Sequence, residues 1–169
     1  MTPLVRKTLL FILTLAPALL APLTASAKDI RFPAKGFPAY VFILPDDWSS
    51  EADDYGNLLM SSATHVTSLV IIIGVGPEAL DEIARVALET AKATPYDHKE
   101  PAEISGCKGF TYFSNMTNPS GVQIKLEMTI VRVDARNFAS ASLLLASGVT
   151  KTDETTARIL KNSFKLVME

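Results

Sequence analysis

The stretch that decides the fold is Val122–Ala146, which reads VQIKLEMTIVRVDARNFASASLLLA. In Val122–Ile130 apolar and polar residues alternate, a period of two that is typical of a half-buried β-strand. The polar tetrapeptide Asp134–Asn137 predicts a turn, and Phe138–Ala146 predicts the antiparallel partner strand. The sequence therefore predicts a long hairpin that packs one face on a core and exposes the face of Gln123–Thr129 to water.

Four further strands are predicted by runs of aromatic and β-branched residues. They are Tyr40–Leu44, Asn57–Ser62, Thr67–Val75 and Gly109–Phe113. The connection Ala63–Val66 carries His65 and is short enough for a hairpin. Ser49–Asp54, which follows the first of these strands, is polar and acidic.

Two helices are predicted, one in the middle of the chain and one near its end. Gly76-Pro77 opens the first, with Pro77 at the first helical position, and Thr94-Pro95 closes it. Its apolar stripe consists of Leu80, Ile83, Ala84, Ala87, Leu88 and Ala91, and its water-facing side of Asp81, Glu82, Arg85 and Glu89. A charged connection, Tyr96–Ala102, follows it.

The second helix begins at Thr152 as its cap and carries Lys161 in its last turn, where a positive charge suits the helix dipole. Its buried stripe is Ala157, Leu160 and Phe164. The element order is then βββαβββα. This order predicts an α+β fold, an antiparallel sheet of about six strands with two main helices packed on one of its faces.

The first 27 residues have the form of a secretory signal peptide. Arg6 and Lys7 precede the apolar run Leu9–Leu20, and Ala25-Ser26-Ala27 offers small residues for cleavage before Lys28. The alternative, an uncleaved anchor, is disfavoured because the run is short and contains Pro17. We therefore expect a bacterial protein of the periplasm or the medium, without a transmembrane anchor in its mature chain.

The mature chain is predicted to hold one domain at 39–169, preceded by an irregular lead-in at 28–38 that contains Pro33, Gly36 and Pro38. Of the 169 residues, one is Cys and two are His, which excludes a disulfide framework and a Cys/His zinc cage. The leader removes two of the 16 basic residues and none of the 18 acidic ones, so the mature chain carries a formal charge of −4. We therefore expect no nucleic-acid partner.

Four separated pieces resemble the PsbP-like and DcrB-like proteins, whose fold is shared with a small eukaryotic Ran-binding import factor. They are Tyr40–Trp48 with its Pro-x-x-Trp ending, the strand entry Glu103–Gly109, the long hairpin, and Ile159–Leu166. The resemblance implies a non-enzymatic accessory protein that binds other proteins, and it supplies no catalytic residues. In this chain Pro45 and Trp48 would turn the backbone and plug a sheet end, and Gly106 and Gly109 would permit tight backbone geometry.

Nucleophilic catalysis would require Cys107 or a serine beside a base, for which only His65 and His98 are available. Lys108 would lower the pKa of the Cys107 thiol if its ammonium lay close. The alternatives are a half-buried thiol without a role and a thiol that links two chains. We interpret Cys107 as the half-buried thiol.

A metal site would have to draw on Asp53, Asp54, His65, Asp97, His98 and Glu100. The densest group, Asp97–Glu100, is interpreted as a solvated loop, because adjacent residues rarely converge on one ion. Gly74–Pro77 lacks the third glycine of a dinucleotide-binding turn. We assign no catalytic, cofactor-binding or metal-ligating residue and expect no cofactor.

The leading hypothesis is an exported, non-enzymatic factor that binds a protein partner in the bacterial cell envelope. One alternative is a small periplasmic hydrolase whose site is assembled from scattered Asp, Glu, His and Ser residues. A second is a periplasmic immunity-type inhibitor of a secreted toxin, which a contiguous surface patch would favour.

Overall fold

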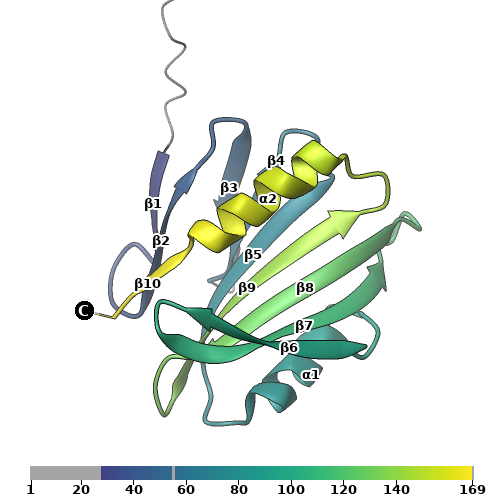
Figure 1. The fold of residues 1–169 in the computed structure, drawn as a ribbon. Coiled ribbons are helices and arrows are strands. Elements are labelled where there is room, and N and C mark those ends of the chain that lie inside the picture. Colours follow the sequence, from purple (N-terminus) through teal and green to yellow (C-terminus); the bar gives the residue numbers. More distant parts are fainter. Residues whose placement is uncertain (1–27, 55, 169) are drawn as a thin grey trace, which may run out of the picture.

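The structure is a computed structural model that describes residues 28–54 and 56–168. This part of the chain forms ten strands and two helices (Figure 1). In chain order they are β1 (Lys28–Phe32), β2 (Ala39–Leu44), β3 (Trp48–Ala52), β4 (Leu58–Ser62), β5 (Thr67–Val75), α1 (Leu80–Thr90), β6 (His98–Ile104), β7 (Cys107–Thr117), β8 (Gln123–Arg132), β9 (Asn137–Ala146), α2 (Lys151–Ser163) and β10 (Lys165–Val167). The α+β class is confirmed, with more strands than the six predicted.

The strands form two antiparallel sheets. The large sheet has seven strands in the order β3-β4-β5-β9-β8-β7-β6, and the small sheet has three in the order β1-β2-β10. The small sheet joins the first described strand and the last one on either side of β2, with Lys28 opposite Leu44 and Lys165 opposite Val41. The predicted signal peptide and its cleavage site lie outside the described residues.

The β8–β9 hairpin is confirmed and lies at the centre of the large sheet. Its turn is held by Asp134, whose carboxylate accepts the backbone N–H groups of Arg136 and Asn137 at 2.7 and 2.8 Å and the Asn137 side-chain amide at 2.6 Å. These bonds, that of the Asn137 side chain foremost, lower the pKa of Asp134. The polar turn thus fixes the register of the hairpin.

The two helices lie on opposite faces of the large sheet, so the predicted packing on one face is wrong (Figure 1). α1 packs on β7 and β8, where its buried Ala84 and Leu88 meet Met128 and Ile130. α2 packs on β2, β5 and β9, and its buried Ala157 and Leu160 join the larger core cluster. α2 buries the stripe that its sequence predicts, and α1 turns its predicted stripe to the sheet except for Ala91, which follows the helix and is exposed.

The prediction that the polar face of β8 is exposed to water is only partly right, because α2 covers part of that face. Gln123 and Lys125 are exposed, but Thr129 is buried and the Glu127 side chain is only 13% exposed. The Arg158 guanidinium on α2 donates to both Glu127 carboxylate oxygens, at 2.7 and 2.6 Å. The polar face of β8 is therefore partly an interface with α2.

Three segments are strands where no strand was predicted. The supposed irregular lead-in at 28–38 begins with β1, which pairs with β2 along its whole length. The polar stretch after Pro45 contains β3, and the charged connection Tyr96–Ala102 contains most of β6. All three strands lie at sheet edges, where one face and one edge meet water, so charged residues are tolerated there.

The helix boundaries also differ from the prediction. α1 begins at Leu80 rather than at Pro77 and ends at Thr90, before Ala91. α2 is capped by Thr150, whose hydroxyl accepts the Asp153 backbone N–H at 3.1 Å, and not by Thr152. Neither helix of the described chain is long and apolar enough to cross a membrane.

The Pro-x-x-Trp and Gly pieces have the structural roles predicted for them. The Trp48 backbone N–H donates to the Pro45 carbonyl at 3.0 Å, and the Trp48 side chain is buried in the larger core cluster. A Cβ on Gly109 would lie 1.9 Å from the Ile130 carbonyl oxygen, so β7 and β8 can approach this closely only with glycine there.

Candidate functional site

The Cys107 thiol packs against the larger core cluster and is partly buried. Burial raises its pKa, and the Glu103 carboxylate raises it further. The expectation that Lys108 would lower this pKa is therefore wrong. A thiol with a raised pKa is a poor nucleophile, which agrees with the interpretation of Cys107 as a small hydrophobic residue.

The two histidines do not come together with Cys107. His65 lies in the β4–β5 turn, where its φ of 55° is left-handed. His98 begins β6, opposite Phe113, and its ring stacks on that of Phe113 with centroids 4.4 Å apart. Cys107 pairs with Ile104 at the other end of the same hairpin, six residues along, so it lies roughly 20 Å from His98.

The acidic and histidine residues considered for a metal site also stay apart. Among residues 28–54 and 56–168, no group of three or more His, Cys, Asp or Glu side chains is placed to hold an ion. His98 and Glu100 lie on one side of β6, 4.0 Å apart at their closest atoms, and the intervening Lys99 lies on the other. Asp97 receives a long hydrogen bond from the Asn115 side chain at 3.4 Å.

A polar cluster that the sequence did not predict joins α1 to the β6–β7 hairpin. The Lys99 ammonium donates to both Asp81 carboxylate oxygens at 2.6 and 2.7 Å, and the buried Tyr112 hydroxyl donates to Asp81 at 2.8 Å. The bonds from Lys99 and then Tyr112 lower the pKa of Asp81, and burial and the Asp81 bond raise that of Tyr112. Because each group bonds to the others, we interpret this cluster as an anchor for α1.

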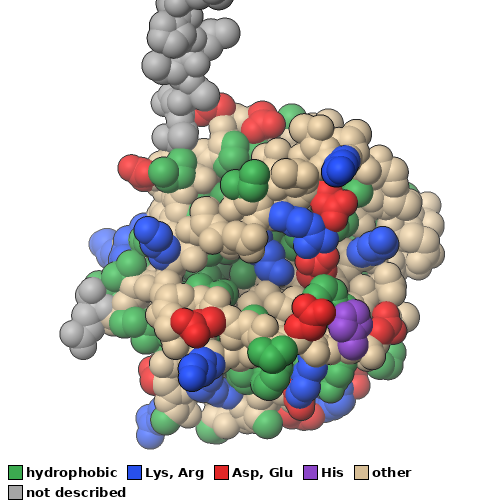
Figure 2. Space-filling model, viewed as in Figure 1, with side chains coloured by type: hydrophobic (Ala, Val, Ile, Leu, Met, Phe, Trp, Pro, Cys, Tyr) green, Lys and Arg blue, Asp and Glu red, His purple; other side chains and the backbone are tan. Residues whose placement is uncertain are grey.

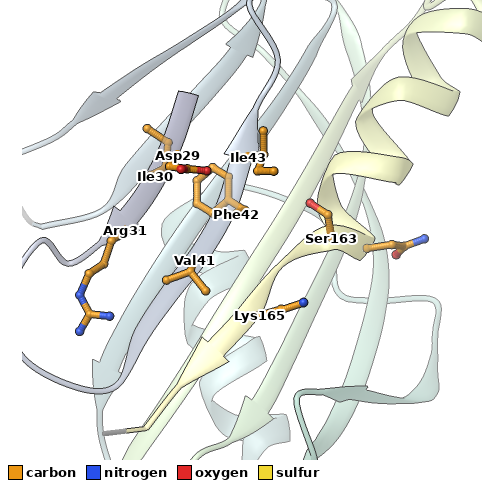
Figure 3. A pocket seen from close by; sticks show the side chains of 9 residues that line it. Asp29, Ile30, Arg31, Val41, Phe42, Ile43, Ser163 and Lys165 are labelled. Atoms are coloured by element: carbon orange, nitrogen blue, oxygen red, sulfur yellow. The ribbon is translucent and has the colours of Figure 1, made fainter. Parts of the chain in front are cut away.

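Two hollows flank the junction of α2 and β10 and share Asn162 and Lys165 in their walls. The first, the small-sheet groove, has a volume of about 640 Å³ and lies against β1, β2 and the end of α2 (Figure 3). Val41 and Ile43 of β2 line it, with Asp29 and Arg31 of β1 and Lys165 of β10. The Ile43 side chain lies on the side of β2 opposite the core and is 56% exposed.

The second hollow, the Lys161 groove, has a volume of about 550 Å³ and lies between the last turn of α2 and the β6–β7 hairpin. The space-filling view shows this face hollowed between the two elements (Figure 2). Three groups line it, namely the hydroxyls of Ser105, Thr111 and Thr129, the charged side chains of Glu103, Lys161 and Lys165, and the apolar side chains of Ile104, Ala141 and Phe164. It is the more polar of the two hollows.

The Lys161 ammonium is unusual among the charged groups of this region. Burial lowers its pKa from 10.5 to about 8, although the nearby Glu127 carboxylate favours the charged form. That carboxylate is bonded by Arg158, and Lys161 itself reaches only the Glu127 backbone carbonyl, at 3.4 Å. A half-buried ammonium without a bonded carboxylate is costly, and such groups cluster at functional sites.

Lys161 was interpreted from the sequence only as a charge that suits the helix dipole. A signal for its burial was nevertheless present, because Lys161 follows Ala157 by four residues and so lies on the side of the helix that Ala157 buries. For Glu103 and Thr129 no local signal exists, since they come from different strands that only the sheet brings together.

The comparisons with known proteins concern the fold. No protein-family model matches the sequence, and no curated protein matches it either. Among solved structures, the chain is similar to the cyanobacterial PsbP protein (CyanoP) of Synechocystis, with a TM-score of 0.61 and 15% identity over 85% of this chain and 94% of that one. It is also similar to LpqN of Mycobacterium tuberculosis, with a TM-score of 0.54 and 12% identity over 84% of this chain and 92% of that one.

These likenesses each cover more than four fifths of this chain and more than nine tenths of the other. The resemblance found in the sequence is thereby confirmed at the level of the fold: the chain has the PsbP-like fold.

Proposed function

We propose that this chain is an exported, non-enzymatic accessory protein that binds a protein partner in the bacterial cell envelope. The observation that carries the proposal is the small-sheet groove, an open apolar groove beside the free edge of β1. The signal-like leader supports export.

The groove fits an extended segment of another protein. Val41 and Ile43 lie on the same face of β2, two residues apart. They offer apolar contacts at the spacing of side chains on one face of an extended segment. β1 pairs only with β2 in the described chain, so no further strand borders the groove beyond β1, and an extended segment can lie across this face of the small sheet.

The charged residues that line the groove indicate which charge the bound segment should carry. Arg31 and Lys165 line it with a single carboxylate, that of Asp29. The Arg31 guanidinium donates to the Gly36 carbonyl at 2.7 Å and lies over the Phe37 ring, so it is already held. Lys165 has no ion-pair partner among the described residues. We infer that the bound segment has alternating apolar side chains and an acidic residue that faces Lys165.

The structural neighbours are compatible with this role. LpqN is described as involved in cell envelope biogenesis. A hydrolase that uses a histidine-activated nucleophile requires the base beside it, and His65 and His98 lie in different elements from each other and from Cys107. No feature of the described chain favours it over binding.

The test is affinity capture from envelope extract with the chain from Lys28 to Glu169 as bait. The groove variant Ile43→Glu is compared with Leu59→Glu, which places the same charge on another exposed strand residue, 43% exposed and in the other sheet. Cys107→Ser runs in parallel to exclude capture through the thiol.

The expected result is one stoichiometric protein that is retained by Leu59→Glu and Cys107→Ser and lost with Ile43→Glu. The purified partner, or a peptide of its extended acidic segment, should then bind the pure protein with the same ranking. Retention by Ile43→Glu, or the absence of any partner, would contradict the proposal.

A further inference from the structure

We propose that the Lys161 groove is a binding site for a small organic monocarboxylate, whose carboxylate pairs with the Lys161 ammonium. This site shares Asn162 and Lys165 with the small-sheet groove, but the proposal does not depend on the partner-binding role proposed above. The reasons are the missing counter-charge, the spare hydrogen-bonding capacity of the groove floor and the distribution of charge along its walls.

The first reason is that Lys161 lacks a carboxylate. The charged groups that act on its ammonium are those of Glu127 and Arg158, and these two form their own pair with two bonds of 2.6 and 2.7 Å. Glu154 also bonds Arg158, at 2.8 Å, so both carboxylates face the guanidinium. No described carboxylate lies within 4.0 Å of Lys161. A ligand carboxylate would supply the charge that the chain does not.

The second reason is the floor of the groove. Thr111 on β7 and Thr129 on β8 lie opposite each other, and their hydroxyl oxygens are 2.8 Å apart. Two hydroxyls hold two hydrogens, and one bond between them uses one. Either hydroxyl can donate that bond, and Thr129 is 5% exposed while Thr111 is partly buried, so the other hydrogen is available to a ligand oxygen in the groove.

The third reason is the charge and shape of the walls. Lys161 and Lys165 face a single carboxylate, Glu103, so the groove has a net positive charge. Glu103 repels a second negative group at the mouth, which favours a ligand with one carboxylate over a dicarboxylate or phosphate. The apolar side chains of Ile104 and Phe164 suit a compact hydrocarbon body.

The test uses the chain from Lys28 to Glu169 and NMR titration with four probes: acetate, benzoate, glutarate and inorganic phosphate. The readouts are the amide shifts of Thr111 and Thr129 and the pH titration of the lysine ε-methylene signals, with that of Lys161 assigned through the variant Lys161→Met. Lys151→Met, at the exposed first turn of the same helix, is the matched control.

Benzoate is expected to shift the groove amides in a saturable way and to raise the pKa of Lys161, since an opposite charge favours the ammonium. Lys161→Met should weaken binding at least about tenfold, while Lys151→Met leaves it within about twofold. Three results would overturn the proposal: no groove shifts with either monocarboxylate, equal affinity in Lys161→Met, or tighter binding of glutarate or phosphate than of benzoate. Because none of these readouts involves a protein partner, the outcome is independent of the capture experiment.

Discussion

Replacement of Lys161 by methionine should make the protein more stable at neutral pH. Methionine keeps the unbranched shape of the side chain and removes the charge that burial disfavours. The pKa of Lys161 falls from 10.5 to about 8 on folding, so charging the folded state costs about 3 kcal/mol at pH 7. For a domain of this size that gain corresponds to a rise in Tm of roughly 10 °C.

The sign of the pH dependence is opposite to that of a paired lysine. Below pH 8 the amine is charged in both states, and the full cost is present. Between pH 8 and 10.5 the folded protein has lost this proton while the unfolded chain still holds it, so the stability of the natural protein rises with pH. The advantage of Lys161→Met should therefore shrink steadily across this interval and nearly vanish above it.

The assay is urea unfolding followed by circular dichroism at pH 7 and pH 10.5, on the natural protein and two variants. Lys165→Met is the control, because Lys165 lines the same groove but is exposed. It should change stability by less than about 0.5 kcal/mol at either pH. If Lys161→Met does not stabilise the protein at pH 7, or stabilises it equally at both pH values, the inference that burial disfavours the charged form of Lys161 is refuted.

Three further substitutions test the packing around α2 and the large sheet. Phe164→Ala removes a ring that packs 4.8 Å from that of Phe42 and should cost about 3–5 kcal/mol in urea unfolding, against under about 1 kcal/mol for the exposed Ile159→Ala. Arg158→Met leaves the largely buried Glu127 carboxylate without its Arg158 partner and should cost about 2 kcal/mol; an unchanged midpoint would show that this pair does not stabilise the contact between α2 and β8. Gly109→Ala should lower Tm by several degrees, since its methyl would meet the β8 backbone, and a neutral result would show that the strands can separate freely.

The sequence predicted the central hairpin because its signal is local. Alternation in Val122–Ile130 and a turn-forming Asp134 need no distant residue to be recognised. The edge strand β6 was missed for the opposite reason, since Pro101 and its charged neighbours are unfavourable in a central strand but acceptable at an edge.

The placement of the helices could not be read from periodicity. The stripes of α1 and α2 predict which side of each helix is buried, but β9 carries small and apolar residues on both faces, as Ala139 and Leu144 illustrate. Either face of the sheet could therefore receive a helix. The Lys161 groove could not be predicted for a related reason, because its walls come from α2, β6, β7, β8, β9 and β10 and meet only in three dimensions.

The small sheet pairs strands from the two ends of the described chain, so it can form only late in synthesis. β2 lies between β1, the first described strand, and β10, which ends at Val167. Because ribosomes build proteins from the N-terminus, β2 lacks its second neighbour until the other described elements have been made. The buried Tyr40 side chain of β2 packs on the ring of Phe164, which directly precedes β10, with ring centroids 5.8 Å apart. This contact can form only after Phe164 has been synthesised. Nascent chains that stop short of Phe164 leave this ring contact unmade, so the small sheet is completed only after the strands of the large sheet have been synthesised.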